Sequence, residues 1–199
     1  MIRKLRPLAA LAAFVLLSAA AGPALAAPAT PPSDSDDVPP FVGARGDTPL
    51  AFAVTGLAHG FAEIGPGARV FAVCWQGGEA PYAVTLRDGA GHTLAAETGL
   101  SGSELILASH PLSFAAGTYD LDVTDAAGGH VDGQFKVVAP ELLPPGPDAN
   151  GAAAVSAAEA ADRAGSAFRY EAYLRVVPAA VGAPGSAADQ LARSLCHRH

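Results

Sequence analysis

Short apolar runs separated by Gly, Pro and Asp dominate the chain between Phe41 and Pro140. Runs of this kind, each bounded by turn-forming residues, are typical of an all-β domain. Within one of them Tyr119, Leu121 and Val123 occupy alternate positions, which places them on one face of a half-buried strand. Seven strands are predicted, over residues 50–55, 68–75, 82–87, 92–96, 104–109, 118–124 and 133–138. Seven strands in about a hundred residues predict an antiparallel β-sandwich over residues 41–140.

The pattern changes beyond Pro140. Pro140 is followed in quick succession by three more prolines, at positions 144, 145 and 147. Proline cannot continue a central strand and stiffens a connecting segment, so residues 141–151 are predicted to form a Pro-rich linker. Between residues 152 and 199 apolar positions recur at helical spacing, which predicts a short α-helical C-terminal tail.

Helices are expected over residues 152–164, 166–177 and 186–196 of this tail. In the first, Glu159 precedes Arg163 by four residues, the spacing of a stabilising ion pair. Pro178 is expected to end the second. Ser186 and Asp189 resemble a capping box with Asp in place of Glu, which predicts the start of the third.

The second of these segments has a broad apolar face formed by Phe168, Tyr170, Tyr173 and Leu174. A helix this short usually needs a partner surface for such a face. Aromatic side chains are frequent anchors of protein interfaces, so these four residues are candidates for binding another protein of the cell envelope. They can equally pack against the sandwich of the same chain, and the sequence leaves both placements open.

The first residues have the three regions of a secretory signal peptide. Basic residues at positions 3, 4 and 6 precede an apolar run, and small residues follow at a cleavage site near Ala26. A membrane-spanning helix needs about 20 continuous apolar residues, and Gly22-Pro23 interrupts this run too early. The sequence therefore predicts a cleaved signal peptide over residues 1–26 and a disordered leader rich in Pro, Ser and Asp over residues 27–40. The mature protein is expected in the periplasm or the medium, without membrane insertion.

Removal of the signal peptide changes the charge balance. Three basic residues are lost, which leaves nine Lys and Arg against nineteen Asp and Glu and a net charge of about −10. Nucleic acids and anionic membranes are bound through clusters of Lys and Arg. Because the sequence has no such cluster after the signal peptide, neither is expected as a partner.

Two cysteines remain after cleavage, Cys74 in a predicted strand and Cys196 in the last predicted helix. An even number of cysteines can pair in an oxidising compartment, and a Cys74–Cys196 disulfide would attach the tail to the sandwich. The alternative is two free thiols, or Cys196 bonded to another molecule. A free Cys196 would offer a thiolate beside His197 and His199, and such a set of ligands suits copper or zinc.

Two segments carry a family resemblance. Trp75–Tyr82 contains a Gly-Gly-x-x-Pro-Tyr turn, and Ala116–Gly128 contains an Ala-Gly-Thr-Tyr strand that runs into a Thr-Asp-Ala-x-Gly hairpin. Together they resemble the immunoglobulin-like domains of bacterial cell-surface and periplasmic proteins of the PKD and SprB-repeat type, present here in a single copy. The resemblance covers about half of the predicted sandwich and implies an immunoglobulin-like fold. Tyr119 is placed like the tyrosine corner of such sandwiches, in which the phenol bonds to the backbone.

One group of carboxylates is a candidate cation site. Asp120, Asp122 and Asp125 lie close together in the sequence, and calcium takes carboxylate oxygens. The sequence lacks the Asp-x-Asp-x-Asp-Gly loop with a distal Glu that calcium-binding loops use. A solvated sheet face with an adjoining turn residue is therefore the favoured interpretation.

The sequence contains no Gly-x-Ser-x-Gly motif, no His-Glu-x-x-His motif and no phosphate-binding Gly loop. It therefore favours a non-enzymatic binding module of the bacterial envelope that uses no cofactor and binds an envelope protein. Two alternatives stay open. One is a metal-handling protein with the C-terminal Cys and His ligands, and the other is a hydrolase that uses His110 or His130 near Ser109 or Asp132.

Overall fold

The computed structural model describes residues 48–146 and 152–197. The predicted signal peptide and leader, the first residues of the predicted sandwich, part of the linker and His199 lie outside the described residues, as does the side chain of His197. No helix in the described ranges is both long enough and apolar enough to cross a membrane.

Eight strands form two sheets. The first sheet has the order β1 (Ala51–Phe52), β3 (Gly67–Gln76) and β6 (Glu104–Phe114). The second has the order β2 (Ala62–Ile64), β8 (His130–Val137), β7 (Gly117–Thr124), β4 (Tyr82–Asp88) and β5 (Thr93–Leu100). All neighbouring strands are antiparallel except β2 and β8, which are parallel. The predicted fold class, an immunoglobulin-like β-sandwich followed by a helical tail, is confirmed.

Every predicted strand is present, although several ends differ. The strand predicted over residues 50–55 is shorter in the structure and covers Ala51–Phe52 only. The strand predicted over residues 104–109 is longer, since β6 continues through Pro111 to Phe114. Pro111 is tolerated because β6 is an edge strand of its sheet. A missing N–H on its outer side removes no hydrogen bond to a neighbouring strand. The sequence does not predict strand β2, because its three residues are too few to reveal an alternating pattern.

Tyr119 forms the predicted tyrosine corner. Its hydroxyl donates to the carbonyl oxygen of Ala115 at 2.9 Å and accepts from the Ala115 N–H at 3.0 Å. The ring stacks on Phe135, with 5.3 Å between ring centroids. The phenol therefore closes one end of the sandwich while its ring belongs to the core.

Strand β3 is buried on both of its faces. Phe71 and Trp75 face the second sheet, where Trp75 packs edge-on against Tyr82 with ring centroids 5.3 Å apart. Ala72 and Cys74 point the opposite way and are also completely buried. The stretch Phe71–Trp75 is apolar on both faces and needs a cover on each side, and the tail supplies the second one.

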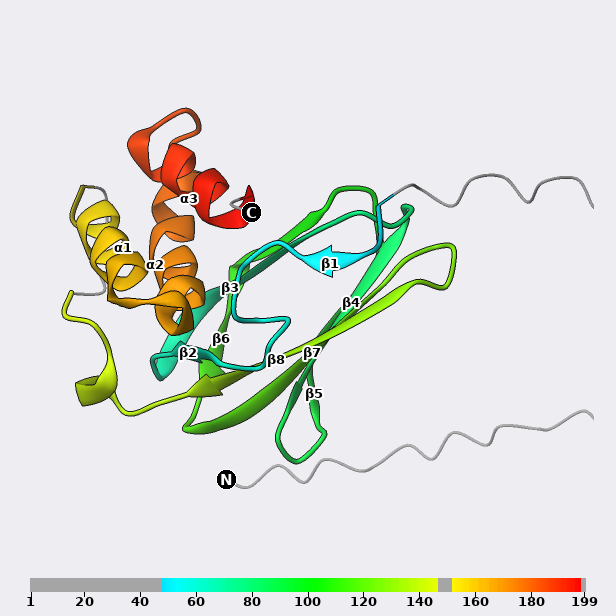
Figure 1. The fold of residues 1–199 in the computed structure, drawn as a ribbon, viewed down its shortest axis with the longest axis horizontal. Helices are drawn as coiled ribbons and strands as arrows, with labels where there is room; N and C mark the ends of the chain where they lie inside the picture. Colours follow the sequence, from blue (N-terminus) through cyan, green and yellow to red (C-terminus); the bar gives the residue numbers. More distant parts are fainter. Residues whose placement is uncertain (1–47, 147–151, 198–199) are drawn as a thin grey trace, which may run out of the picture. The chain divides into compact units, whose positions relative to one another are not determined.

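The tail forms three α-helices. They are α1 (Ala152–Ala164), α2 (Arg169–Gly182) and α3 (Ala187–His197), with 3₁₀ turns η1 (Pro140–Leu142) and η2 (Ser166–Phe168). Helix α2 contacts β2 and β3 and packs between α1 and α3 (Figure 1). Buried residues of the sandwich and the tail form one continuous hydrophobic core. The tail is therefore a third layer over the smaller sheet.

The expected end of the second helix is wrong. Helix α2 passes Pro178 and continues to Gly182. Pro178 has no N–H to donate to the carbonyl of Leu174, which weakens one turn of the helix. Burial of Val177 and Ala180 on either side of that turn stabilises it nonetheless.

Two local predictions for the other helices are confirmed. The Asp189 N–H donates to Ser186 Oγ at 3.3 Å, while the Asp189 carboxylate accepts from the Gly185 N–H at 2.7 Å. This is a capping box whose second bond is displaced by one residue. In α1, Arg163 Nη1 lies 3.7 Å from Glu159 Oε2.

The four residues proposed as a partner surface lie between the tail and the sandwich instead. Tyr170 and Tyr173 are completely buried, Leu174 is buried, and Phe168 is half-buried. The Tyr170 hydroxyl donates to the carbonyl oxygen of Ala72 at 3.0 Å. Of the two placements that the sequence leaves open, the structure has the one within the chain, because the outer face of β3 has to be covered.

A buried carboxylate orients the tail on the sandwich. Glu171 of α2 is completely buried, and its Oε2 accepts from the Gly65 N–H at 2.9 Å and from Arg69 Nη1 at 2.7 Å. Its Oε1 accepts from Arg175 Nε at 2.7 Å. Both oxygens are thus bonded to donors, as a buried carboxylate requires. We call Glu171, Gly65, Arg69 and Arg175 the Glu171 cluster.

Arg175 extends this cluster to two further segments. Its Nη1 donates to the carbonyl oxygen of Ala157 in α1 at 3.3 Å, and its Nη2 donates to that of Pro144 in the linker at 3.2 Å. One side chain therefore connects α2, α1 and the linker, while Glu171 connects α2 to the sandwich.

Cys74 and Cys196 are joined in a disulfide, with their Cα atoms 6.1 Å apart. The bridge attaches α3 to the outer face of β3. It spans 122 residues of sequence, so in the unfolded chain it closes a long loop.

Loss of the disulfide is expected to lower the free energy of unfolding. A loop of this length corresponds to about 4–5 kcal/mol in the chain-entropy model. Urea unfolding of the oxidised protein should be compared with that of the reduced protein and of the Cys74→Ala/Cys196→Ala variant. Equal transition midpoints before and after reduction would show that the bridge does not stabilise the fold.

Glu171→Gln replaces the carboxylate shared by Arg69 and Arg175 with a neutral amide. Removal of one partner of a buried ion pair costs about 3–5 kcal/mol, so we expect a loss of this order in the free energy of unfolding. Glu159→Gln is the matched control, because the exposed Glu159–Arg163 pair contributes less than about 0.5 kcal/mol. Similar unfolding midpoints for the two variants would contradict the role assigned to the Glu171 cluster.

Candidate functional site

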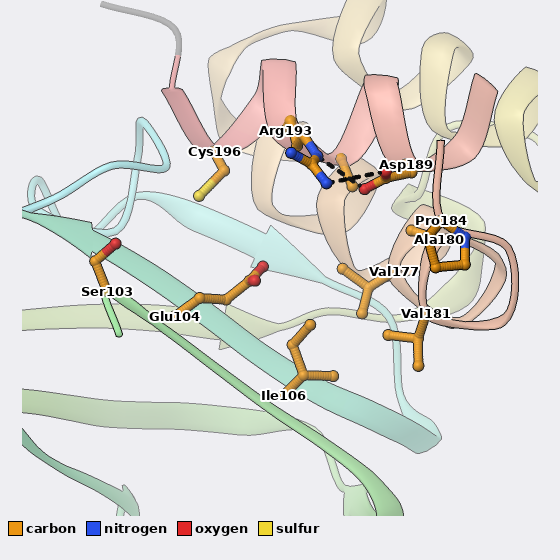
Figure 2. Close-up of a pocket in the computed structure, with 11 residues that line it drawn as sticks. Ser103, Glu104, Ile106, Val177, Ala180, Val181, Pro184, Asp189, Arg193 and Cys196 are labelled. Atoms are coloured by element: carbon orange, nitrogen blue, oxygen red, sulfur yellow. Dashed lines mark hydrogen bonds and ion pairs between the residues drawn. The ribbon is translucent and has the colours of Figure 1, made fainter. Parts of the chain in front are cut away.

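A groove lies between strand β6 and the helices of the tail. In the register of the first sheet, Glu104 and Ile106 stand opposite Cys74 and Ala72, so they share the face that the tail covers. Helices α2 and α3 rise beside this face and enclose a cavity of about 500 Å³ (Figure 2). We call it the tail groove, and its lining includes Glu104, Ile106, Val177, Val181, Asp189 and Arg193.

Glu104 is held in place by a buried phenol. The Tyr173 hydroxyl donates to Glu104 Oε1 at 2.6 Å. Burial, followed by the negative charge of Glu104, raises the pKa of Tyr173 well above its ordinary value. The phenol therefore remains a donor at physiological pH and fixes the orientation of the Glu104 side chain.

Arg193 is oriented by Asp189 on the same helix. Its Nε and Nη2 donate to the two carboxylate oxygens at 3.0 and 3.1 Å. The Arg193 side chain, together with the Gly185 N–H, holds the pKa of Asp189 below its ordinary value. The pair is bidentate, and it leaves Nη1 of the guanidinium outside the pairing.

Charged groups of opposite sign face each other across the tail groove. Figure 2 shows Arg193 on α3 and Glu104 on the sheet, with the apolar side chains of Ile106, Val177 and Val181 beside them. The bond to Asp189 raises the pKa of Arg193, and the charge of Glu104 adds to the rise. The lining thus contains two carboxylates and one guanidinium, and its net charge is negative.

The three carboxylates considered as a candidate calcium site stand on two different structural features. Asp120 and Asp122 project from the outer face of β7, where Asp122 pairs with Arg87. Asp125 lies in the following turn, and its carboxylate accepts from the Gly129 N–H at 2.6 Å. Within the described residues, no group of three His, Cys, Asp or Glu side chains is arranged to hold a metal ion. Asp120 and Asp122 therefore belong to the polar outer face of the sheet, and Asp125 stabilises the turn that follows β7.

The residues of the hydrolase alternative are divided between the two sheets. His130 Nδ1 lies 3.7 Å from Asp132 Oδ1, and both residues belong to β8. Ser109 and His110 belong to β6 in the other sheet. The structure therefore brings a His and an Asp together without placing the candidate Ser nucleophile beside them.

The C-terminal metal alternative loses its sulfur ligand when the protein is oxidised. Cys196 is bonded to Cys74, and a disulfide sulfur is not a thiolate. The other two candidate ligands, the side chain of His197 and His199, lie outside the described residues.

Two further cavities are less suited to a ligand. One of about 650 Å³ is lined mostly by turns around Asp125, whose carboxylate already accepts from backbone N–H groups. Another of about 460 Å³ lies over the polar face around Asp120 and Gln134, which bond to each other at 2.9 Å. Of these cavities, the tail groove combines an apolar wall with oriented charges, the usual composition of a ligand site.

Sequence reasoning missed the residues of the tail groove. Asp189 and Arg193 carry a signal, since a carboxylate four residues before an arginine predicts a pair on one helix face. Glu104 carries no such signal. Its surroundings depend on the position of helix α2, whose Tyr173 lies 69 residues later in the sequence.

No protein-family model matches the chain, and no curated protein matches it. Among solved structures, it is similar to CopC from Methylosinus trichosporium OB3b, with a TM-score of 0.30 and 21% identity over 41% of this chain and 87% of CopC. The BSP domain of a biofilm associated protein gives a TM-score of 0.34 and 17% identity over 42% of this chain and 14% of that chain.

A third similar structure is a DUF3244-family protein with an immunoglobulin-like β-sandwich fold from Bacteroides vulgatus. It gives a TM-score of 0.28 and 16% identity over 37% of this chain and 86% of that chain. These similarities extend to less than half of the chain. The immunoglobulin-like character of the family resemblance agrees with the fold, and its narrower PKD or SprB-repeat type stays a prediction.

The two buried tyrosines of α2 predict a loss of stability in alkali. Burial raises the pKa of Tyr170 and of Tyr173, whereas both titrate near pH 10 in an unfolded chain. Their stabilisation is therefore complete below about pH 10 and falls as the pH rises, by about 1.4 kcal/mol per group and pH unit. Urea unfolding at several alkaline pH values should show a shallower decline for Tyr173→Phe than for the unaltered protein. Identical slopes would refute this assignment.

Proposed function

We propose that this chain is an exported, non-enzymatic binding module of the bacterial envelope and that the tail groove is its ligand site. The observation that carries the proposal is the groove itself, whose charged side chains are fixed before any ligand arrives. Tyr173 orients Glu104, and Asp189 orients Arg193. Preorganised groups lose little entropy on binding, which favours recognition.

The chemistry of the groove supports binding rather than catalysis. A general base works best with a pKa near the operating pH, and the residues lining the groove include no His. The sulfur atom of Cys196 in the groove belongs to the Cys74–Cys196 disulfide, so it is not a thiolate. The raised pKa of Tyr173 keeps that phenol protonated. Ser103 also lines the groove, but a Ser nucleophile needs a neighbouring base.

Export is the second part of the proposal. A disulfide persists in oxidising compartments such as the periplasm and the extracellular space, so the Cys74–Cys196 bridge supports a location outside the cytoplasm. The predicted signal peptide points to the same compartment. An envelope protein is the proposed partner, and the negative net charge speaks against nucleic acid.

A photo-crosslinking amino acid placed at position 181 tests the groove in living cells. Val181 is 47% exposed at the groove, so the substitution should be tolerated by the core. We expect one envelope protein to be captured from position 181. Leu142, which is 62% exposed in η1, is the matched control, and the same photo-reactive residue at this position should not capture it.

Capture of the same species from both positions would place the binding surface elsewhere. Absence of any crosslink from position 181, in a protein whose unfolding midpoint is unchanged, would contradict the groove as the ligand site. Val181→Trp should also reduce capture from a crosslinker at Ile106, because the indole would occupy the groove.

A further inference from the structure

We propose that the tail groove receives a short extended segment of the partner, which pairs with the free edge of β6 and places a Lys or Arg side chain against Glu104. This inference rests on the proposed function and specifies the chemistry of the ligand. Three features of the groove carry it: an open strand edge, a limit on its length, and the charge of its lining.

The first feature is the open edge. Within the described residues, β6 pairs with β3 on one side and with no strand on the other. Its outer backbone N–H and C=O groups are therefore free to bond to another extended chain, which is the basis of recognition by strand addition. Glu104 and Ile106 belong to this strand and also line the groove, so an added strand would run directly beside it.

The second feature limits the added strand. Between Leu107 and Leu112, four residues of β6 stand opposite the single residue Val70, because the register shifts at this point. The shift ends the regular edge, and Pro111 within it has no N–H to donate. Regular pairing is thus available along Glu104–Leu107, which suits a segment of about four residues.

The third feature selects the side chains. Alternate residues of an added strand would lie on the groove side, one beside Glu104 and one beside Ile106. The carboxyl group of Glu104 is fixed by Tyr173, whereas Arg193 is already engaged by Asp189. A basic residue is the complement of Glu104, and an apolar residue two positions away is the complement of Ile106. The geometry therefore predicts a basic and an apolar residue two positions apart, in the order basic-x-apolar for a strand parallel to β6 and apolar-x-basic for an antiparallel one.

Synthetic peptides test this pattern on the purified mature protein. The probe is acetyl-Leu-Thr-Lys-Thr-Leu-amide, which presents the pattern in both strand directions, and its counterpart has Glu in place of Lys. Calorimetric titration should detect binding of the Lys peptide and at least tenfold weaker binding of the Glu peptide. Glu104→Gln should weaken binding of the Lys peptide about tenfold, which corresponds to about 1.4 kcal/mol.

Glu97→Gln is the matched control for the loss of charge. Glu97 is an exposed carboxylate on β5, the edge strand of the other sheet. Glu97→Gln changes the net charge of the protein by the same amount as Glu104→Gln. Equal weakening of Lys-peptide binding by both variants would therefore reveal unspecific attraction and overturn the proposal. Both variants should unfold at the same urea midpoint as the unaltered protein.

Backbone pairing is tested separately from charge. Two forms of the Lys peptide carry N-methyl groups on one or the other alternate set of backbone nitrogens. Only one set can face β6, so one form should lose binding and the other should retain it. Equal binding of both forms would exclude strand addition.

The outcomes distinguish this inference from the proposed function. If crosslinking from position 181 captures an envelope protein but the Lys peptide does not bind, the groove remains a ligand site and the peptide chemistry is wrong. If Glu104→Gln binds the Lys peptide as tightly as the unaltered protein does, recognition by Glu104 is wrong. If position 181 captures nothing, the proposed function itself fails.

Discussion

The structure depends on a single strand whose two faces are both apolar. Residues 71–75 of β3 are completely buried, so the smaller sheet needs the second sheet on one side and the tail on the other. Full burial of a large apolar side chain contributes about 1.5–3 kcal/mol, and α2 supplies two buried tyrosines to this contact. An isolated sandwich would expose the outer face of β3 to water. The tail is thus part of the folded domain rather than an appendage.

Apolar contacts hold the tail to the sheet, but they do not by themselves fix its orientation. The Glu171 cluster does so, because its bonds to Gly65 and Arg69 can form in one position of the helix only. Buried ion pairs add little net stability, since desolvation opposes the attraction, but they penalise every arrangement that leaves a charge unpaired. The position of the helices in turn sets the shape of the tail groove.

The sequence predicts what depends on local pattern and misses what depends on docking. The alternation around Tyr119 and the Ser186 cap predicted a strand and a helix start, because both signals lie within a few residues. The helical spacing of apolar residues reveals the face that contains Tyr170, but it does not reveal what this face contacts. An apolar face can pack against another protein or against the sheet of the same chain equally well. Glu171 and Glu104 are beyond such reasoning, because each owes its surroundings to a segment far away in sequence.

The separation of the two cysteines bears on how the protein matures. A chain that is made from its N-terminus contains Cys74 well before Cys196, which follows 122 residues later. Until α2 is complete at Gly182, the outer face of β3 has no covering helix, and a strand with an uncovered apolar face is prone to associate with other chains. The bridge can form only after α2 has been made, because Cys196 follows that helix in the chain, so oxidation locks a third layer that already covers the sheet.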